Sequence, residues 1–436
     1  MTSSLTTGAE RRHRYQPGTA RAALAYPEYR VLFIGMTLSS IGTWMQNLTL
    51  PAYIDHRTGS ASLVGLLVFT QLGPLLLLSI PAGVLADRVD RTRLVIAAQS
   101  TMLVAAIGLA ALIWIDAPLW TIFTVQLAIG VANAVNAPAF NASLNLLVDR
   151  PDRPGAISLN SAMLNGTRIL GPAVAALLGV LGFGVSRLLL VNAATFLFLI
   201  VPLFRVRLPD VRGNHPEQGW RRLLSGVNIA RRRLVLSRLL VTMSMFSLVC
   251  LPFIGLFSSV SRMNFGIDPS GSTFRWLYVV WGLGALTGSL AVGTVFANTL
   301  KSRLVAPGFV LFGVSLAGFA AARTASVAFP VAVALGFFYF LTATSLITVL
   351  QQNMADHERG AVMPLWFMAW GGSIPIGNLI AGPIIDAVGA RPVLYSGAAF
   401  ALFLARWGNL DRLPKSAFLA EHEHHQPMPV SDSEPF

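Results

Sequence analysis

Two long runs without a charged residue set the strongest limit on how this chain can fold. Residues 61–86 and 94–115 are uncharged over 26 and 22 positions, and the five charged residues of GVLADRVDRTR, residues 83–93, separate them. A helix rises about 1.5 Å per residue, so either run can cross a hydrocarbon core of about 30 Å. The charged segment is therefore expected to form a turn at a membrane surface.

The same pattern recurs along the chain and predicts a polytopic membrane protein. Of the 436 residues, 54% are hydrophobic and 12% are charged, which is too apolar for a soluble domain. The runs are continuously apolar and do not alternate with period two, which excludes a barrel. We expect twelve helices, at residues 31–54, 61–86, 94–115, 119–147, 157–181, 187–204, 239–261, 273–296, 304–322, 327–350, 362–388 and 392–407.

These helices predict an all-α membrane protein made of two pseudo-symmetric six-helix bundles. Between the bundles lies an Arg-rich interval that includes WRRLLSGVNIARRRLVLSRLL, which we expect to form an amphipathic surface helix. The expected domains are an N-terminal tail at 1–30, the first bundle at 31–204, the basic linker at 205–238, the second bundle at 239–407 and a disordered tail at 408–436.

The distribution of Lys and Arg predicts the orientation. These residues are concentrated in the two tails and the central linker, so the positive-inside rule places both termini in the cytoplasm. The net charge of +13 is confined to short segments between apolar runs, which favours anionic lipid head groups at the cytoplasmic face over nucleic acid as the partner. We expect a monomer with a small-molecule substrate.

An internal repeat supports the division into two halves. Shifting the sequence by 210 positions places GVLADRVDRTR on GTVFANTLKSR, residues 293–303, and the RPGA segment at 153–156 recurs as ERGA at 358–361. Two halves with matching landmarks are typical of transporters whose repeats rock around a central site.

The charged turn and several further motifs resemble the major facilitator superfamily. Its signature loop between helices 2 and 3 is matched by Gly83, Leu85, Ala86, Asp87, Arg88, Arg91 and Arg93. The motifs GTWMQ (42–46), APAFNASLNLLV (137–148), LNSAMLNGTRILGP (159–172) and GLGALTG (282–288) are similar to the transmembrane secretion effector branch, which contains siderophore exporters related to the enterobactin exporter. This resemblance implies a twelve-helix exporter.

The resemblance also implies a conformational latch in the loop of Gly83, Asp87, Arg88, Arg91 and Arg93. A carboxylate at the end of helix 2 can accept hydrogen bonds from the free N–H groups at the start of helix 11, where the helix dipole favours an anion. The contact would form only while the cytoplasmic side is closed. The alternative is a positive-inside loop whose aspartates balance charge.

Arg168 is the most informative candidate for a substrate cavity. It falls at the middle of helix 5 and shares a face with Ser161 and Asn165. An arginine at this depth is costly unless it faces water or a partner, and its guanidinium can bind carboxylate, phosphate or phenolate oxygens as a fork. An arginine tied to backbone carbonyls or to a neighbouring helix is the competing interpretation.

Other polar side chains recur on the inner helices. Gln126 and Asn133 lie seven residues apart on one stripe of helix 4, with Asn136 beside it, and Gln46 and Asn47 lie on helix 1. Trp370 offers a flat apolar face for a ring-bearing substrate. These residues either line the cavity or hold the helices together by interhelical hydrogen bonds.

Proton coupling requires a group that changes charge, and no carboxylate falls near the middle of a span. Asp55, beside His56 near an outer helix end, is the remaining candidate, with an ordinary loop acid as the alternative. The chain departs from the family pattern at Thr43, where many relatives carry aspartate, and at Gln126, where the family carries arginine. Ala297 replaces the acid of the second-half loop.

No P-loop and no nucleophile with a base are present, so the sequence predicts neither an ATP-driven pump nor an enzyme, and no cofactor. The tail EHEHH, residues 421–425, is expected to be disordered rather than a metal site. We expect a secondary exporter of a small hydrophobic or aromatic molecule, and an anionic, siderophore-like molecule is one such substrate. The alternatives are a multidrug efflux carrier and a non-transporting receptor or scaffold.

Overall fold

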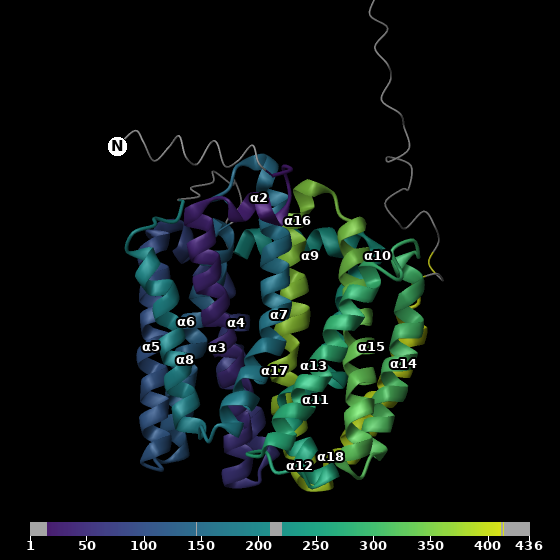
Figure 1. The fold of residues 1–436 in the computed structure, drawn as a ribbon. Helices are drawn as coiled ribbons and strands as arrows, with labels where there is room; N and C mark the ends of the chain where they lie inside the picture. Colours follow the sequence, from purple (N-terminus) through teal and green to yellow (C-terminus); the bar gives the residue numbers. More distant parts are fainter. Residues whose placement is uncertain (1–14, 145, 210–219, 411–412, 414–436) are drawn as a thin grey trace, which may run out of the picture.

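A computed structural model describes residues 15–144, 146–209, 220–410 and 413, and the described residues form helices and no strands. Long helices run side by side in one bundle (Figure 1). After the short helix α2 (Ala20–Leu24), the first half contains α3 (Pro27–Thr58), α4 (Ala61–Arg88), α5 (Arg91–Trp114), α6 (Leu119–Leu144), η1 (Arg150–Asp152), α7 (Arg153–Val180) and α8 (Val185–Leu203).

The second half follows the short helix α9 (Trp220–Arg232), and two of its long helices are interrupted. It comprises α10 (Leu234–Met245), η2 (Phe246–Cys250), α11 (Pro252–Gly255), α12 (Phe257–Phe265), α13 (Ser272–Gly293), α14 (Lys301–Ala321), α15 (Ala325–Gln352), α16 (Asp356–Phe367), η3 (Met368–Gly372), α17 (Ser373–Val388) and α18 (Ala390–Trp407).

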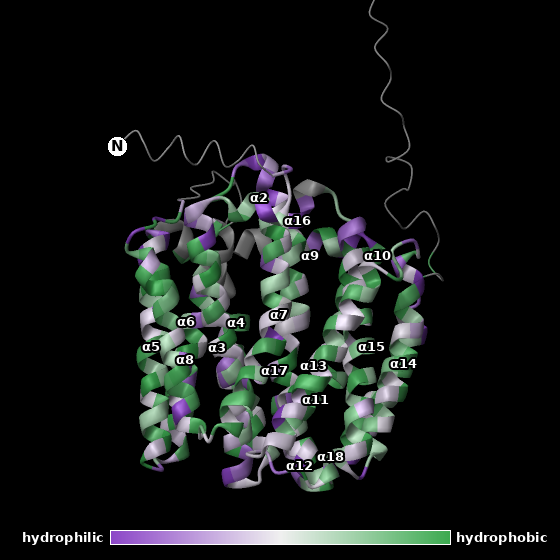
Figure 2. Cartoon of the chain, in the orientation of Figure 1, coloured by the Kyte–Doolittle hydropathy of each residue, from purple (hydrophilic) through white to green (hydrophobic). Residues whose placement is uncertain are grey.

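The predicted all-α membrane fold is confirmed. Nine of the described helices are long and apolar enough to cross a membrane, or ten if a bent pair counts as one span. Helices α3 and α18 lie in the same bundle, although they fall outside that set, so the count of twelve crossings stays a prediction. Hydrophobic residues cover the flanks and hydrophilic residues gather at the two ends (Figure 2). Exposed Val104, Phe198 and Val314 illustrate a surface that only lipid can cover.

Both ends of the described chain lie at one end of the bundle. Helix α2 lies at the top of Figure 1, and Arg238 at the start of α10 lies over the Trp407 ring at the end of α18, with its Cζ 4.9 Å from the ring centroid. We call this end the terminal end and the opposite end the far end.

Two of the predicted helices are interrupted where the sequence analysis expects single helices at 239–261 and 362–388. The first has a π-turn at Phe246–Cys250 directly before Pro252, which has no N–H to donate to the helical ladder. The second has a π-turn at Met368–Gly372, which ends on two glycines. Both interruptions place backbone that is not ideal α-helix beside the centre of the bundle.

The first long helix of the second half starts inside the interval predicted as the basic linker. Helix α9 lies within the predicted linker, and α10 starts at Leu234, inside the segment assigned to the linker, after a bend of 114°. Arg233 at the bend forms an ion pair with Glu358 at 3.1 Å, which links the linker to α16. Charged residues here extend the helix beyond its apolar run because they remain at the membrane surface.

Close backbone contacts set the helix packing. A Cβ atom added at Gly284 or Gly288 of α13 would overlap a carbonyl oxygen of α15, that of Val333 or Phe337. The GxxxG spacing therefore brings α13 and α15 to the close approach that small residues permit. The two halves meet where α7 packs against α13 and α4 packs against α17.

Candidate functional site

A cavity of about 270 Å³ lies between the two halves. The first half contributes lining residues from α3, α4 and α7, and the second half from α11, α12, α13, α15, η3 and α17. Its predominantly apolar wall includes Leu72, Leu75, Ile169, Leu286 and Ile374. A concave, mostly apolar pocket with a few polar groups is the usual form of a small-molecule site.

Arg168 of α7 lies in this cavity among aromatic rings. Its Cζ is 4.7 Å from the centroid of Trp370, 5.3 Å from that of Trp44 and 5.7 Å from that of Phe340. Its Nε is buried and has no hydrogen-bond partner among the described residues. The rings stabilise the cation through their faces, and the guanidinium remains available to a ligand.

The other polar lining residues hold one another in place or remain unpaired. Gln71 donates to Asn47 from helix to helix. The indole Nε1 of Trp370 donates to the hydroxyl oxygen of Tyr339 over 2.9 Å, and the Tyr339 ring stacks on Trp281 at 6.2 Å between centroids. These contacts fix the aromatic wall opposite Arg168.

The structure brings together only some of the residues predicted for the cavity. Arg168, Asn47 and Trp370 line it. Gln46 and Gln126 do not, because Gln46 Nε2 donates to Gln126 Oε1 over 3.1 Å and Asn192 donates to Gln46 Oε1 over 2.7 Å. For these two residues the structure matches the alternative of interhelical hydrogen bonding.

The remaining predicted residues are not among those that line the cavity, or their side chains are not described by the structure. Asn133 is half-buried, Asn136 is buried and Ser161 is exposed, and none of the three is among the residues that line the cavity. The side chain of Asn165 lies outside the part of the chain that the structure describes.

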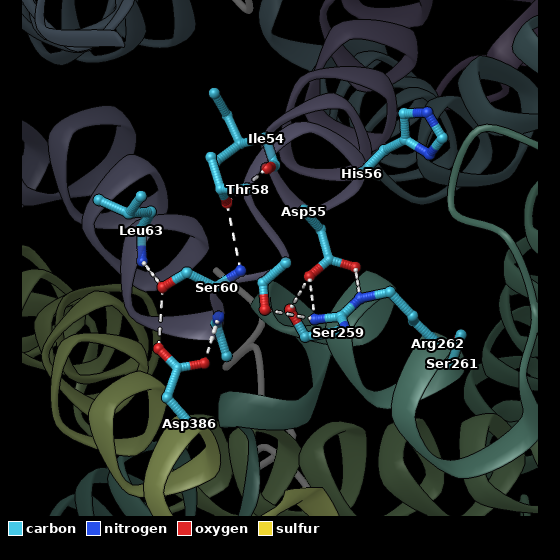
Figure 3. A network of polar contacts seen from close by, with 12 residues as sticks. Ile54, Asp55, His56, Thr58, Ser60, Leu63, Ser259, Ser261, Arg262 and Asp386 are labelled. Carbon is cyan, nitrogen blue, oxygen red and sulfur yellow. Dashed lines mark hydrogen bonds and ion pairs between the residues drawn. The ribbon is translucent and has the colours of Figure 1, made fainter.

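Asp55 is fully buried at the far end, where it joins the two halves (Figure 3). Arg262 of α12 donates from Nε to Oδ2 over 3.1 Å and from Nη2 to Oδ1 over 3.0 Å, and Ser259 donates to Oδ1 over 2.7 Å. The same Arg262 Nη2 donates to the Gly59 carbonyl oxygen over 2.7 Å. This bidentate, charge-assisted geometry is the strong form of an ion pair.

A second link at the far end caps a helix of the other half. The Asp386 carboxylate of α17 accepts hydrogen bonds from the backbone N–H groups of Ala61 and Ser62, over 2.7 and 2.9 Å, and from the hydroxyls of Ser60 and Ser62 (Figure 3). These donors are the free groups at the start of α4, where the helix dipole favours an anion.

An exposed pair lies beside these two links. His56 Nδ1 and Asp268 Oδ1 are 3.0 Å apart, and both side chains are more than half exposed. Partial burial works to raise the pKa of Asp268, but hydrogen bonds from Ser270 and the nearby His56 outweigh it and hold that pKa below 3.8. Exposed pairs of this kind contribute little to stability.

The predicted latch loop is only partly described. Arg91 is buried and donates to the Ser143 hydroxyl over 3.4 Å, and Arg93 is exposed. Asp90 accepts from the Arg93 N–H over 2.9 Å and so caps α5. The side chains of Asp87 and Arg88, with Gly83, lie outside the part of the chain that the structure describes, as does the EHEHH tail.

The partners of Asp55 and Ser60 at the far end are not evident from the sequence. No sequence motif assigns a role to Arg262 or Asp386. A local signal existed only for Ser60, whose side chain accepts from the Leu63 N–H as a helix N-cap. In the residues that the structure describes, no group of three His, Cys, Asp or Glu could hold a metal ion.

Comparison with known proteins gives one family. A family model described as transmembrane secretion effector matches residues 18–432. The chain is 24% identical to macrolide efflux protein A of Streptococcus pyogenes, over 84% of this chain and 91% of that protein. It is 26% identical to the staphyloferrin A transporter of Staphylococcus aureus, over 83% and 90% of the two chains. It is also 26% identical to the enterobactin exporter EntS of Salmonella typhimurium, over 78% and 81%.

Solved structures show the same fold. The nucleoside transporter NupG superposes with a TM-score of 0.71 at 14% identity, covering 89% of this chain and all of that one. A bacterial homologue of the human lysosomal transporter Spinster, in an inward-facing and unoccupied conformation, superposes with a TM-score of 0.70 at 14% identity and covers 91% and 99% of the two chains.

Proposed function

Because the chain belongs to the transmembrane secretion effector family of the major facilitator superfamily, we propose that it is a secondary active exporter working by alternating access. The proposed substrate is a small hydrophobic or aromatic molecule. One observation carries the proposal: a central cavity is built by both halves of the chain, and two polar links join those halves at one end. The proposed location is a bacterial inner membrane with both termini in the cytoplasm.

With that orientation, the far end faces the outside and is closed in this conformation. Among the described residues, the hydrogen bonds and ion pairs between the halves include the links at Asp55, Asp386 and His56, and all three lie at the far end. We propose that these contacts form the outer latch, which must break before the cavity can open outward. The signature loop with Asp87 is the proposed inner latch.

The burial and pairing of Asp55 support a role in the latch over proton transport. Both of its carboxylate oxygens accept hydrogen bonds from residues of the other half, Arg262 and Ser259. Asp55 is also not among the residues that line the cavity. A carboxylate held in this way joins the two halves and lies apart from the cavity.

Broad efflux is the second candidate function, because the cavity wall is largely apolar and the chain is 24% identical to the multidrug efflux pump Tap of Mycolicibacterium fortuitum over 89% of its length. Flat apolar walls can accept many ring systems. Charge selectivity separates the two functions, since a broad carrier transports cations.

Transport by the purified chain tests the proposal. Proteoliposomes containing only this protein are loaded with 1-naphthoate, a compact aromatic anion, or with ethidium, an aromatic cation, and an ion gradient is imposed. Faster exit of either compound than from protein-free vesicles supports a transporter. Exit of ethidium in preference to 1-naphthoate favours broad efflux. Equal exit with and without the protein, for both gradient directions, would leave a receptor or scaffold.

A further inference from the structure

Three buried polar atoms at the cavity have no hydrogen-bond partner among the described residues. They are Arg168 Nε, Trp281 Nε1 and Ser258 Oγ, and all three residues line the cavity. The guanidinium and the indole can only donate, and the hydroxyl can donate or accept. A buried polar group without a partner is destabilising, so an acceptor that reaches these atoms gains more than it would from a solvated group.

The charge of the cavity is also unbalanced. No carboxylate is among the described residues that line it, and Arg168 forms no ion pair within that part of the chain. The faces of Trp44, Trp370 and Phe340 surround the guanidinium at 4.7 to 5.7 Å from their centroids. Ring faces stabilise a cation less than a charge-assisted hydrogen bond to an anion does, so an anion remains the better partner.

The donors come from both halves of the chain. Arg168 lies on α7, whereas Ser258 lies on α12 and Trp281 on α13. A Cβ atom added at Gly282 would lie 3.2 Å from Ile169, so α7 and α13 touch at the residues directly after Arg168 and Trp281. An acid group that reaches these donors therefore touches both halves at once.

The aromatic wall completes the site. Trp281 packs on Tyr278 and stacks on Tyr339, at 5.1 and 6.2 Å between ring centroids, and the Tyr339 ring lies 4.5 Å from that of Phe340. Planar rings gain offset or edge contacts with such a wall. The cavity volume of about 270 Å³ lies just below the usual range of ligand pockets, which favours one compact ring system.

We infer that the cavity selects compact aromatic monoanions, with the ring against Tyr278, Tyr339 and Phe340 of the aromatic wall and the carboxylate or phenolate oxygens on Arg168, Trp281 and Ser258. The inference deepens the proposed function and rests on it only for transport, since binding requires no gradient. A cationic ligand is repelled by Arg168, because no carboxylate among the described lining residues compensates the two positive charges. A neutral amide gains the ring contacts but not the charge-assisted hydrogen bonds.

Isothermal titration of the purified full chain in detergent micelles tests this selectivity with three probes of one shape: 1-naphthoate, 1-naphthamide and 1-naphthylmethylammonium. We expect 1-naphthoate to bind about tenfold or more tightly than the amide, and the ammonium to bind more weakly than both. Arg168→Gln should remove the preference for the anion and leave amide affinity within about twofold. Arg168→Lys should restore part of it, because the charge remains without the fork.

A second variant does not depend on the fold tolerating loss of Arg168. Trp281→Phe removes the N–H and keeps a ring, and it should weaken 1-naphthoate binding about threefold to tenfold. Trp276→Phe is the matched control, because Trp276 lies on the same helix, is 43% exposed and is not a lining residue; it should bind as the unmodified chain does.

The inference is overturned by equal affinity for the anion and the amide, by tighter binding of the ammonium, or by no binding of 1-naphthoate at all. It is also overturned if the preference for the anion survives in Arg168→Gln. These outcomes are distinct from failure of the proposed function. A chain that binds 1-naphthoate selectively but moves nothing in proteoliposomes contradicts only the exporter, and a chain that exports without charge preference contradicts only the inference.

Discussion

Arg262 donates two parallel hydrogen bonds to Asp55, from Nε to Oδ2 over 3.1 Å and from Nη2 to Oδ1 over 3.0 Å, although the two residues lie 207 positions apart in different halves of the chain. The carboxylate is completely buried, whereas the arginine side chain is 30% exposed. A buried ion pair is costly to break from one side, because the remaining charge loses its partner. The pair therefore biases the molecule toward a closed far end.

We predict that Asp55→Asn opens the far end more often. The test places a reporter at Ser258→Cys, beside Ser259, in a chain whose one native cysteine, the buried Cys250, is replaced by serine. A membrane-impermeant maleimide added at the far side should label this cysteine about fivefold or more faster in Asp55→Asn, because the buried charge that pairs with Arg262 is lost.

Asp268→Asn is the matched control for that experiment. Asp268 also links the halves at the far end, but its side chain is 56% exposed. Because hydrogen bonds from Ser270 and the nearby His56 hold the pKa of Asp268 below its ordinary value, the carboxylate keeps its charge at neutral pH and loses it only as the pH falls through the lowered pKa. Labelling of this variant should match the parent between about pH 5 and 8. Equal acceleration in both variants would remove the special role of Asp55.

Asp386→Asn should weaken closure by a separate route. The carboxylate caps α4 by accepting from the Ala61 and Ser62 N–H groups, and an amide offers one acceptor oxygen and no charge to the helix dipole. A loss of about 0.5–2 kcal/mol is expected, which gives faster far-side labelling of the Ser258→Cys reporter. A labelling rate equal to that of the parent would show that the cap does not help to close the far end.

Gly288→Ala should destabilise the second half. A Cβ atom there would overlap the Phe337 carbonyl oxygen, so α13 and α15 must separate. Overpacking of this kind costs about 1–3 kcal/mol, and we expect a lower thermal unfolding midpoint in micelles. Gly293→Ala on the same helix is the control, since nothing lies within 4 Å of its Cβ position. Equal midpoints for the two variants would contradict the packing argument.

The fold could be predicted from the sequence because membrane crossing is a local property. Length and apolar composition alone indicate each helix, and the charged segments mark where helices end. The interruptions at Phe246–Cys250 and Met368–Gly372 could not be predicted in the same way, because a π-turn changes the local hydrogen bonding without changing hydropathy.

The candidate site could be predicted from the sequence only where burying one residue in the membrane carries a large free-energy cost. Arg168 stands out because a charge at mid-membrane is costly unless it faces water or a partner, and it lies in the cavity. Gln46 and Gln126 lie on different helices and carry no charge, and helical periodicity does not reveal which neighbour the face of a helix meets. The Asp55–Arg262 pair depends on how two bundles lie against each other, which no local pattern encodes.

The signature loop yields a prediction about the inner latch. Asp87→Asn should impair export of 1-naphthoate from proteoliposomes without abolishing expression, because an amide at the end of α4 no longer stabilises a neighbouring helix start. Asp90→Asn is the comparison, since Asp90 caps its own helix α5. Unimpaired export in Asp87→Asn counts against the latch, and equal impairment in both variants favours simple charge balance in the loop.

Gln46 distinguishes a structural network from a cavity wall. Gln46→Ala removes the donor to Gln126 and the acceptor for Asn192, which leaves two buried groups with one partner fewer. The expected cost is about 1–3 kcal/mol of stability, seen as a lower thermal unfolding midpoint, with 1-naphthoate affinity unchanged within about twofold. Asn47→Ala, one residue further along and in the cavity, should instead lower the affinity. A Gln46→Ala variant that unfolds at the same temperature as the parent but binds 1-naphthoate poorly would indicate that Gln46 contributes to substrate binding.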